Sequence, residues 1–365
     1  MSQDDSRLIR QLVQLLVDAY LSTRLDCLYN GPSLHHLHTY HTMATLRYDP
    51  EFAKALEPLR SKRPSGPPQT ALEIRRNNDA LFENMFPKAP SADIIQQTDY
   101  TIQSYDGANI LLRRFAKPEH LSVKEPLPTI LAIHGGGFIS GSVDACAGLV
   151  ADKVLAADRP IFAVGYRLAP EHPHPAPVED SYAALKYLLD HAAKLNIDPK
   201  RVAVQGESAG GGLAVGVALL ARDRELQPSI AKLLLTYPEI DDRARNDKDA
   251  EFLKFATWTP KHNELAWAAY VGEDKAGKPE ADVSPYAAPA RAATYKGLPS
   301  TYVDVGTLDV FREENMEFVR RLLVDDVEVE FHVWPGVPHV FEFLGPGTKW
   351  HVRATEARVN AMKEF

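Results

Sequence analysis

The sequence has little cysteine, no long apolar segment and no basic cluster, and each absence excludes a class of protein. The two cysteines, Cys27 and Cys146, lie far apart among 365 residues and in no metal-binding spacing, which argues against a disulfide framework. No run of about 18 apolar residues is present, so we expect no membrane-spanning helix and no stable membrane insertion. The formal net charge of −8, with no basic run, argues against a nucleic-acid partner.

The beginning of the chain lacks the features of a targeting signal. Residues 1–7 do not have the positive charge that precedes the apolar core of a secretory signal peptide. The composition is ordinary for a globular protein and allows a large core. We therefore expect a cytoplasmic protein whose mild acidity serves solubility.

Two glycine-containing motifs are the most informative features that are present. Gly206–Gly210 (GESAG) fits G-x-S-x-G and lies between a β-prone run at 201–205 and an apolar, helix-like stretch at 209–222. This context predicts a nucleophilic serine, Ser208, on a sharp strand-to-helix turn. His134–Phe138 (HGGGF) follows another strand-like run and offers unhindered backbone N–H groups for an oxyanion. A flexible hinge is the alternative role for this glycine run. A phosphate-binding loop is disfavoured, because neither G-x-x-x-x-G-K-[ST] nor a G-x-G-x-x-G that opens a helix follows these glycines.

A serine nucleophile needs a histidine base, which follows it in the chain order of α/β-hydrolases. His339 lies in a turn-rich segment directly after the predicted strand at 328–333, where a catalytic histidine is expected. The other histidines after Ser208 fall inside predicted strands or helices: His262, His332 and His351.

The acid that orients the histidine should follow another strand. Asp309 comes directly after the predicted strand at 300–306 and before a predicted helix at 310–324. Asp304 lies within the strand and is the weaker candidate. Asp309 also suits the N-cap of that helix, so capping is the alternative role.

These motifs, together with Tyr166–Pro173, Gly306–Asp309 and Pro338-His339, resemble the hormone-sensitive-lipase-like carboxylesterases of the α/β-hydrolase superfamily. The resemblance runs from about residue 100 to the end of the chain. It implies Ser208 as nucleophile, His339 as base and Asp309 as orienting acid. It implies no metal and no organic cofactor. It also implies an oxyanion hole made by the backbone N–H groups of three residues: Gly135, Gly136 and Ala209.

Three positions depart from residues that are common in this family. Glu207 precedes the serine where Asp or Thr is frequent, Val340 follows the histidine where Gly is frequent, and the acid loop reads Asp309–Glu314 (DVFREE). All three departures keep the reacting groups, so they concern supporting contacts and substrate preference. Tyr166–Pro173 is interpreted as a loop that positions the neighbouring glycines.

The remaining pattern alternates strands and helices, which predicts an α/β-hydrolase fold with a mostly parallel eight-stranded sheet and helices on both faces. Strands are expected near 98–104, 109–115, 128–133, 160–166, 201–205, 231–237, 300–306 and 328–333. Helices are expected near 144–157, 177–194, 209–222, 310–324 and 349–363.

Two segments do not follow this alternation. Residues 1–95 are expected to form an N-terminal helical cap region ahead of a catalytic domain at 96–365, with a second cap segment inserted at about 239–274. Within the first, Asp5–Arg24 has the apolar spacing of an amphipathic helix that packs on its own protein, a membrane surface or a dimer partner. A linker is expected at 61–69 and a further helix at 70–86.

Two features of these segments invite specific interpretations. Aromatic residues of the second cap segment are expected to line an apolar substrate pocket. A histidine cluster is interpreted as a polar surface rather than a zinc site, because it has no cysteine or clear carboxylate partners: His35, His36, His38 and His41.

The sequence thus predicts a serine carboxylic-ester hydrolase that forms an acyl-enzyme with short- to medium-chain or small-molecule esters. A lactonase, amidase or acyltransferase acting on a secondary metabolite is the alternative, since the same site serves these reactions. A non-catalytic ligand receptor is more remote, because the family uses its scaffold in that way when the histidine is lost and His339 is present. A homodimer is compatible with the sequence.

Overall fold

The computed structural model describes residues 46–60, 66–243 and 250–365, which belong to one compact unit, Leu46–Phe365. The predicted amphipathic helix Asp5–Arg24, the histidine cluster and part of the predicted linker lie outside the described residues.

The unit is built on an eight-stranded sheet with the strand order β1-β2-β4-β3-β5-β6-β7-β8. Strands β1 and β2 pair antiparallel, β2 also pairs antiparallel with β4, and every pair from β4 to β8 is parallel. The predicted mostly parallel, eight-stranded sheet is therefore confirmed. The strands are β1 (Gln96–Gln103), β2 (Asn109–Ala116), β3 (Leu127–Ile133), β4 (Ile161–Gly165), β5 (Ile197–Glu207), β6 (Lys232–Thr236), β7 (Thr301–Gly306) and β8 (Val329–Trp334).

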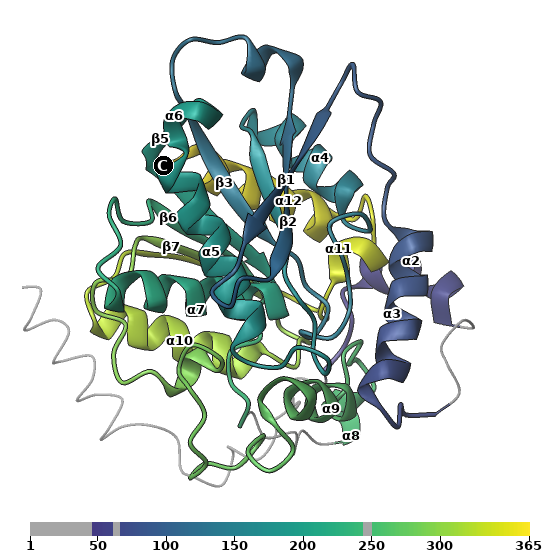
Figure 1. Ribbon diagram of the computed structural model, residues 1–365. Coiled ribbons are helices and arrows are strands. Elements are labelled where there is room, and N and C mark those ends of the chain that lie inside the picture. Colours follow the sequence, from purple (N-terminus) through teal and green to yellow (C-terminus); the bar gives the residue numbers. More distant parts are fainter. Residues whose placement is uncertain (1–45, 61–65, 244–249) are drawn as a thin grey trace, which may run out of the picture. The chain divides into compact units, whose positions relative to one another are not determined.

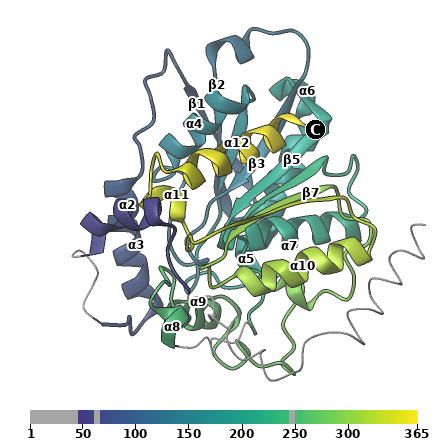
Figure 2. The ribbon, with the colours of Figure 1, turned by 180° about the vertical axis from the view of Figure 1, so that it is seen from behind.

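Helices cover both faces of the sheet (Figures 1 and 2). On one face α5 (Ala176–Asp190), α7 (Ala209–Asp223) and α10 (Arg312–Val324) enclose the larger apolar core. On the other face α4 (Ala147–Ala157) and α12 (Lys349–Lys363) enclose a second core. The central parallel strands are continuous apolar runs because both of their faces are buried.

Four helices lie away from these two layers, beyond the carboxyl ends of the parallel strands (Figure 1): α2 (Pro50–Arg60), α3 (Ala71–Met85), α8 (Ala250–Leu253) and α9 (Pro260–Val271). Helix α3 begins at the N-cap Thr70, whose hydroxyl accepts from the N–H of Glu73, while the Glu73 carboxylate accepts from the N–H of Gln69. Helices α3 and α9 contact each other although they are far apart in the sequence.

Some helices differ from the prediction. The predicted helix over 177–194 is interrupted at His191 and continues as the short α6 (Ala192–Leu195). The sequence pattern does not predict α2, α8 or α11 (Phe341–Leu344), because α2 contains Pro58 and the other two are only four residues long. Short 3-10 helices occur at Pro118–Leu121 and Pro289–Arg291.

Candidate active site

Ser208 lies on a sharp turn between β5 and α7, with a φ of 54° and a ψ of −122°. The turn requires small neighbours. A Cβ added to Gly206 would lie 2.0 Å from the carbonyl oxygen of Gly210, and a Cβ on Gly210 would lie 2.2 Å from that of Ile133. The unusual backbone of Ser208 is thus imposed by close packing between strand and helix, and it brings the hydroxyl to the end of the sheet.

The structure brings Ser208 together with His339 and Asp309. The Oγ of Ser208 is 2.9 Å from Nε2 of His339, and Nδ1 of His339 is 2.8 Å from Oδ2 of Asp309. Ser208 is 9% exposed, His339 4% and Asp309 0%. The three side chains come from the ends of β5, β7 and β8, so they form a buried chain of hydrogen bonds in the order that a nucleophile, a base and an orienting acid require.

Asp309 uses both of its carboxylate oxygens. Its Oδ2 faces the histidine, while its Oδ1 accepts a hydrogen bond of 2.9 Å from the N–H of Phe311 at the start of α10. Phe311 rather than Asp309 is the N-cap residue of α10 and makes no side-chain cap hydrogen bond, so the capping alternative drawn from the sequence is wrong. The hydrogen bond from Phe311 instead fixes the carboxylate that faces His339.

Aromatic and cap residues hold the His339 ring. The rings of Tyr237 and Phe311 meet it edge-on at centroid distances of 4.4 and 5.0 Å. The hydroxyl of Thr257 donates to the carbonyl oxygen of His339 at 2.8 Å. These contacts restrict rotation of the His339 ring.

The weaker sequence candidates all lie elsewhere, each with its own partner. Asp304, on β7, accepts hydrogen bonds from Arg358 and the Tyr302 hydroxyl. The three other histidines are also bonded locally: His262 to Thr259, His332 to Glu330, and His351 to the N–H of Gly347.

The glycine run packs directly against the serine turn. A Cβ on Gly135 would lie 2.9 Å from the carbonyl oxygen of Glu207 and 3.4 Å from Cβ of Ser208, and Gly136 has a φ of 123°. No described residue accepts a hydrogen bond from the N–H of Gly135 or Gly136. Ala209 is the first residue of α7, where a helix leaves its N–H groups unpaired. These three N–H groups are therefore available to hold an anion beside Ser208.

The Tyr166–Pro173 loop supports this glycine run, in line with its predicted positioning role. The Tyr166 hydroxyl donates to the carbonyl of His134 at 2.9 Å, and its ring stacks on the imidazole at 4.3 Å. Burial lowers the pKa of His134 to about 4, so that this histidine is neutral at pH 7. It is a structural residue of the loop.

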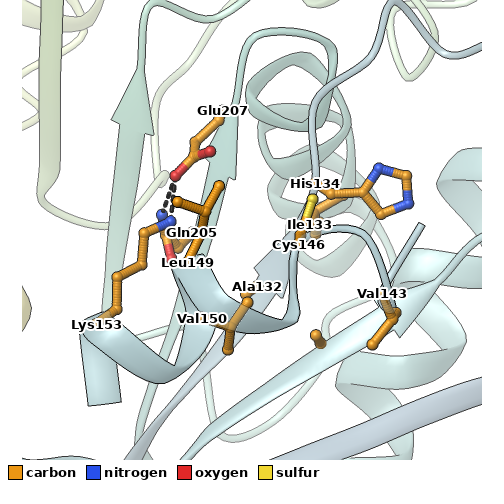
Figure 3. A pocket seen from close by; sticks show the side chains of 11 residues that line it. Ala132, Ile133, His134, Val143, Cys146, Leu149, Val150, Lys153, Gln205 and Glu207 are labelled. Atoms are coloured by element: carbon orange, nitrogen blue, oxygen red, sulfur yellow. Dashed lines mark hydrogen bonds and ion pairs between the residues drawn. The ribbon is translucent and has the colours of Figure 1, made fainter. Parts of the chain in front are cut away.

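Glu207, the residue before Ser208, is held by partners that were not predicted from the sequence. Its carboxylate forms an ion pair with Lys153 and accepts from Nε2 of Gln205 at 3.1 Å (Figure 3). Burial acts to raise the pKa of Glu207, but the Lys153 ammonium outweighs it and holds this pKa below its usual value. The sequence feature that could have indicated this ion pair is the single lysine, Lys153, inside the apolar stretch of α4.

Beside this ion pair lies a cavity of about 20 Å³, large enough for one water molecule. Figure 3 shows Cys146 and His134 along the same cavity. Burial raises the pKa of the Cys146 thiol to about 12, so it is not a reactive thiolate at neutral pH.

Aromatic residues of the segment at 239–274 pack around the glycine run. A Cβ on Gly137 would lie 2.7 Å from the indole of Trp258. On α9, Trp267 and Tyr270 contact the ring of Phe138 at centroid distances of 4.9 and 4.3 Å. The other two predicted pocket aromatics pack away from the glycines: Phe252 with Phe311, and Phe255 with Tyr48.

A buried Ser-His-Asp chain beside free backbone N–H groups, on an α/β sheet, defines a serine hydrolase site. Comparison with known proteins agrees. Residues 130–343 match the model of a family described by the alpha/beta hydrolase fold. The carboxylesterase NlhH of Mycobacterium tuberculosis is 32% identical over 250 residues, which cover 64% of this chain and 72% of NlhH. The esterase LipI of the same species is 33% identical over 56% of this chain, and the match covers only 62% of LipI.

Among solved structures, a bacterial heroin esterase superposes with a TM-score of 0.78 and 35% identity, covering 87% of this chain and 97% of that one. The chain therefore belongs to the hormone-sensitive-lipase-like carboxylesterases of the α/β-hydrolase fold. In the part of the chain that the structure describes, no helix is long and apolar enough to cross a membrane. The same part contains no group of three His, Cys, Asp or Glu residues arranged to hold a metal ion.

Proposed function

We propose that this protein hydrolyses carboxylic esters of small molecules through a covalent acyl-enzyme on Ser208. The observation that carries the proposal is the continuous chain from Ser208 through His339 to Asp309, with distances of 2.9 and 2.8 Å. The names of its relatives, a carboxylesterase and a heroin esterase, support ester hydrolysis as the reaction.

In the first half of the proposed reaction, Nε2 of His339 takes the hydroxyl proton as Ser208 Oγ attacks the ester carbonyl carbon. The tetrahedral oxyanion accepts hydrogen bonds from N–H groups of the glycine run and of Ala209. His339 then gives the proton to the leaving alkoxide, and the alcohol departs. Asp309 keeps Nδ1 protonated and stabilises the imidazolium that forms.

In the second half, a water molecule gives a proton to His339 and its oxygen attacks the acyl carbon. The second tetrahedral oxyanion collapses, the bond to Ser208 Oγ breaks as His339 returns the proton to that oxygen, and the carboxylic acid is released. No step of this sequence needs a metal or an organic cofactor.

We further propose that the described part of residues 1–95, with the segment at about 239–274, forms a cap over a catalytic domain at 96–365. Three contacts support this division: α3 with α9, Asn78 of α3 with Ser140 just after the glycine run, and Trp258 with Gly137. The bulky rings beside Gly137 and Phe138 favour short- to medium-chain or compact substrates.

The test of this proposal is hydrolysis of a ladder of p-nitrophenyl esters from acetyl to dodecanoyl. We expect turnover that peaks at short chains. A peak at the longest chains would overturn the proposed preference for short- to medium-chain or compact substrates. No turnover of any chain by folded protein would overturn the esterase assignment, and lactones, amides and added acceptor alcohols would then be assayed in its place.

Cytoplasmic residence and a possible homodimer stay predictions. Cell fractionation and light scattering of the full chain test them.

A further inference from the structure

Glu239 lies in direct backbone contact with the proposed nucleophile. It follows β6, and its N–H donates to the carbonyl oxygen of Ser208 at 3.0 Å. The flanking residues are fixed by α10. Nδ2 of Asn315 donates to the Pro238 carbonyl at 2.7 Å, and Oε1 of Glu314 accepts from the N–H of Ile240 at 2.8 Å. The position of Glu239 is therefore set from two sides.

The side chain of Glu239 is fully buried, yet neither carboxyl oxygen has a hydrogen-bond partner among the described residues. Glu207, the other acid in contact with the serine turn, is paired with Lys153 and Gln205. Buried polar groups in proteins nearly always have a partner, and those that do not are found where a ligand, a water molecule or catalysis requires them. Glu239 is thus an exception at the reaction centre.

Electrostatics determine the form in which Glu239 meets a ligand. Burial raises the pKa of Glu239 well above its usual value, and the nearby carboxylate of Asp309 raises it further. The raised pKa favours the protonated carboxylic acid, which has one O–H donor and free acceptor positions. Its natural complement is a neutral group that both donates and accepts, such as a hydroxyl.

The backbone of Glu239 also lies close to Phe138, the last residue of the glycine run. A Cβ on Gly212 would lie 2.1 Å from the Glu239 carbonyl oxygen and 3.7 Å from the ring of Phe138, so the backbone of Glu239 lies close to this ring. Two more buried polar groups without a partner pack on the same ring, the indole N–H of Trp267 and the hydroxyl of Tyr270.

We propose that Glu239 is a specificity-determining residue that favours esters carrying a hydroxyl group a few bonds from the ester carbonyl over alkyl esters of the same size. The proposal rests on the esterase function proposed above. A site built to hydrogen-bond a substrate hydroxyl discriminates against the analogue that lacks it, because its own polar groups then stay unpaired.

The test compares pairs of esters that differ only by OH in place of CH₃. On the acyl side the pair is p-nitrophenyl 3-hydroxypropanoate and p-nitrophenyl butanoate. On the alcohol side it is 2-hydroxyethyl butanoate and propyl butanoate, followed by pH-stat. For each pair the ratio of kcat/KM for the hydroxyl ester to that for the alkyl ester is measured in the wild-type protein, E239Q and E239L. Because each ratio compares two substrates of the same protein, a loss of active protein does not change it.

We expect E239L to lower this ratio by about tenfold on one of the two sides, which identifies the part of the ester that meets Glu239. E239Q keeps the shape and both hydrogen-bonding functions, so its ratio should stay within about threefold of wild type. An E239L ratio equal to wild type on both sides would overturn the proposal and leave ester hydrolysis standing. Failure of the proposed esterase function would give a different result, namely hydrolysis that persists in Ser208→Ala. Should E239L not fold, E239M provides the same comparison.

Discussion

The proposed triad and the glycine run beside it are held by different parts of the molecule. Ser208, Asp309 and His339 each follow a strand, so the sheet fixes their mutual distances. The three residues that directly follow the glycine run are instead bonded to α3, a helix outside the sheet layers. The contacts are Arg75 Nε to Ile139 O at 2.5 Å, Asn78 Nδ2 to Ser140 Oγ at 3.0 Å, and Gly141 N–H to Asp79 Oδ1 at 3.0 Å.

Arg75 connects this helix to a second support of the glycine run. Its guanidinium also donates to the carbonyl of Ala169 at 2.6 Å and pairs with both oxygens of Glu171, whose pKa it holds at about 2. The difference between the two regions separates two contributions to catalysis. In the proposed mechanism, proton transfer would depend on the sheet, whereas stabilisation of the oxyanion would depend on contacts made by α3.

The largest effect is expected on the sheet side. Asp309→Asn should lower kcat by about 10⁴-fold, because an amide no longer holds His339 in the tautomer that accepts the serine proton. Steady-state hydrolysis of p-nitrophenyl acetate measures the effect. Asp304→Asn is the matched control, since Asp304 is equally buried on β7 but bonded to Arg358. Equal losses in both variants would show that the orienting role is misassigned.

A smaller loss is expected at the junction of the two regions. Gly136→Ala would bring a Cβ to 2.1 Å from the Ser140 carbonyl at a φ of 123°, so the loop must shift away from Ser208. We expect kcat to fall by about 10²- to 10³-fold while the fold is kept. Circular dichroism checks folding beside the kinetics. Normal kcat in a folded variant would exclude the glycine run as the oxyanion site.

On the cap side the effect should be smaller again. Arg75→Ala removes the bonds to Ile139 and Ala169, and we expect kcat to fall by about tenfold with KM changed less than about threefold, because the loss concerns the transition state. Arg76→Ala, an exposed arginine on the same helix, is the control. If the two variants behave alike, α3 does not position the oxyanion site.

The smallest effect is expected on the melting temperature when Glu239, which lies between the serine turn and α10, is replaced. A carboxyl whose pKa is raised in the folded state contributes stability below its unfolded pKa, near 4.5, and loses that contribution as the pH rises toward the folded pKa. E239Q should therefore gain about 2 °C in melting temperature over wild type between pH 4 and pH 8. A difference that is constant across this range would contradict a raised pKa.

Most of the sheet and the triad could be predicted from the sequence because each depends on local pattern. Buried parallel strands are apolar runs, and Ser208 and Asp309 stand where such runs end, whereas His339 follows the alternating edge strand β8. The contacts of the cap could not be predicted. Arg75 lies in a polar helix whose partners are more than sixty residues away, and nothing in the local pattern identifies them. Glu239 looks like a loop acid in the sequence, and only tertiary packing buries it.

The proposal that Ser208 is the nucleophile of an ester hydrolase is tested by removing its hydroxyl. Wild-type protein and Ser208→Ala are assayed side by side on p-nitrophenyl acetate, with folding verified by thermal unfolding. We predict clear turnover by the wild type and a kcat that is lower by at least about 10⁴-fold in the variant. Comparable turnover by both proteins, or none by folded wild type, would contradict it.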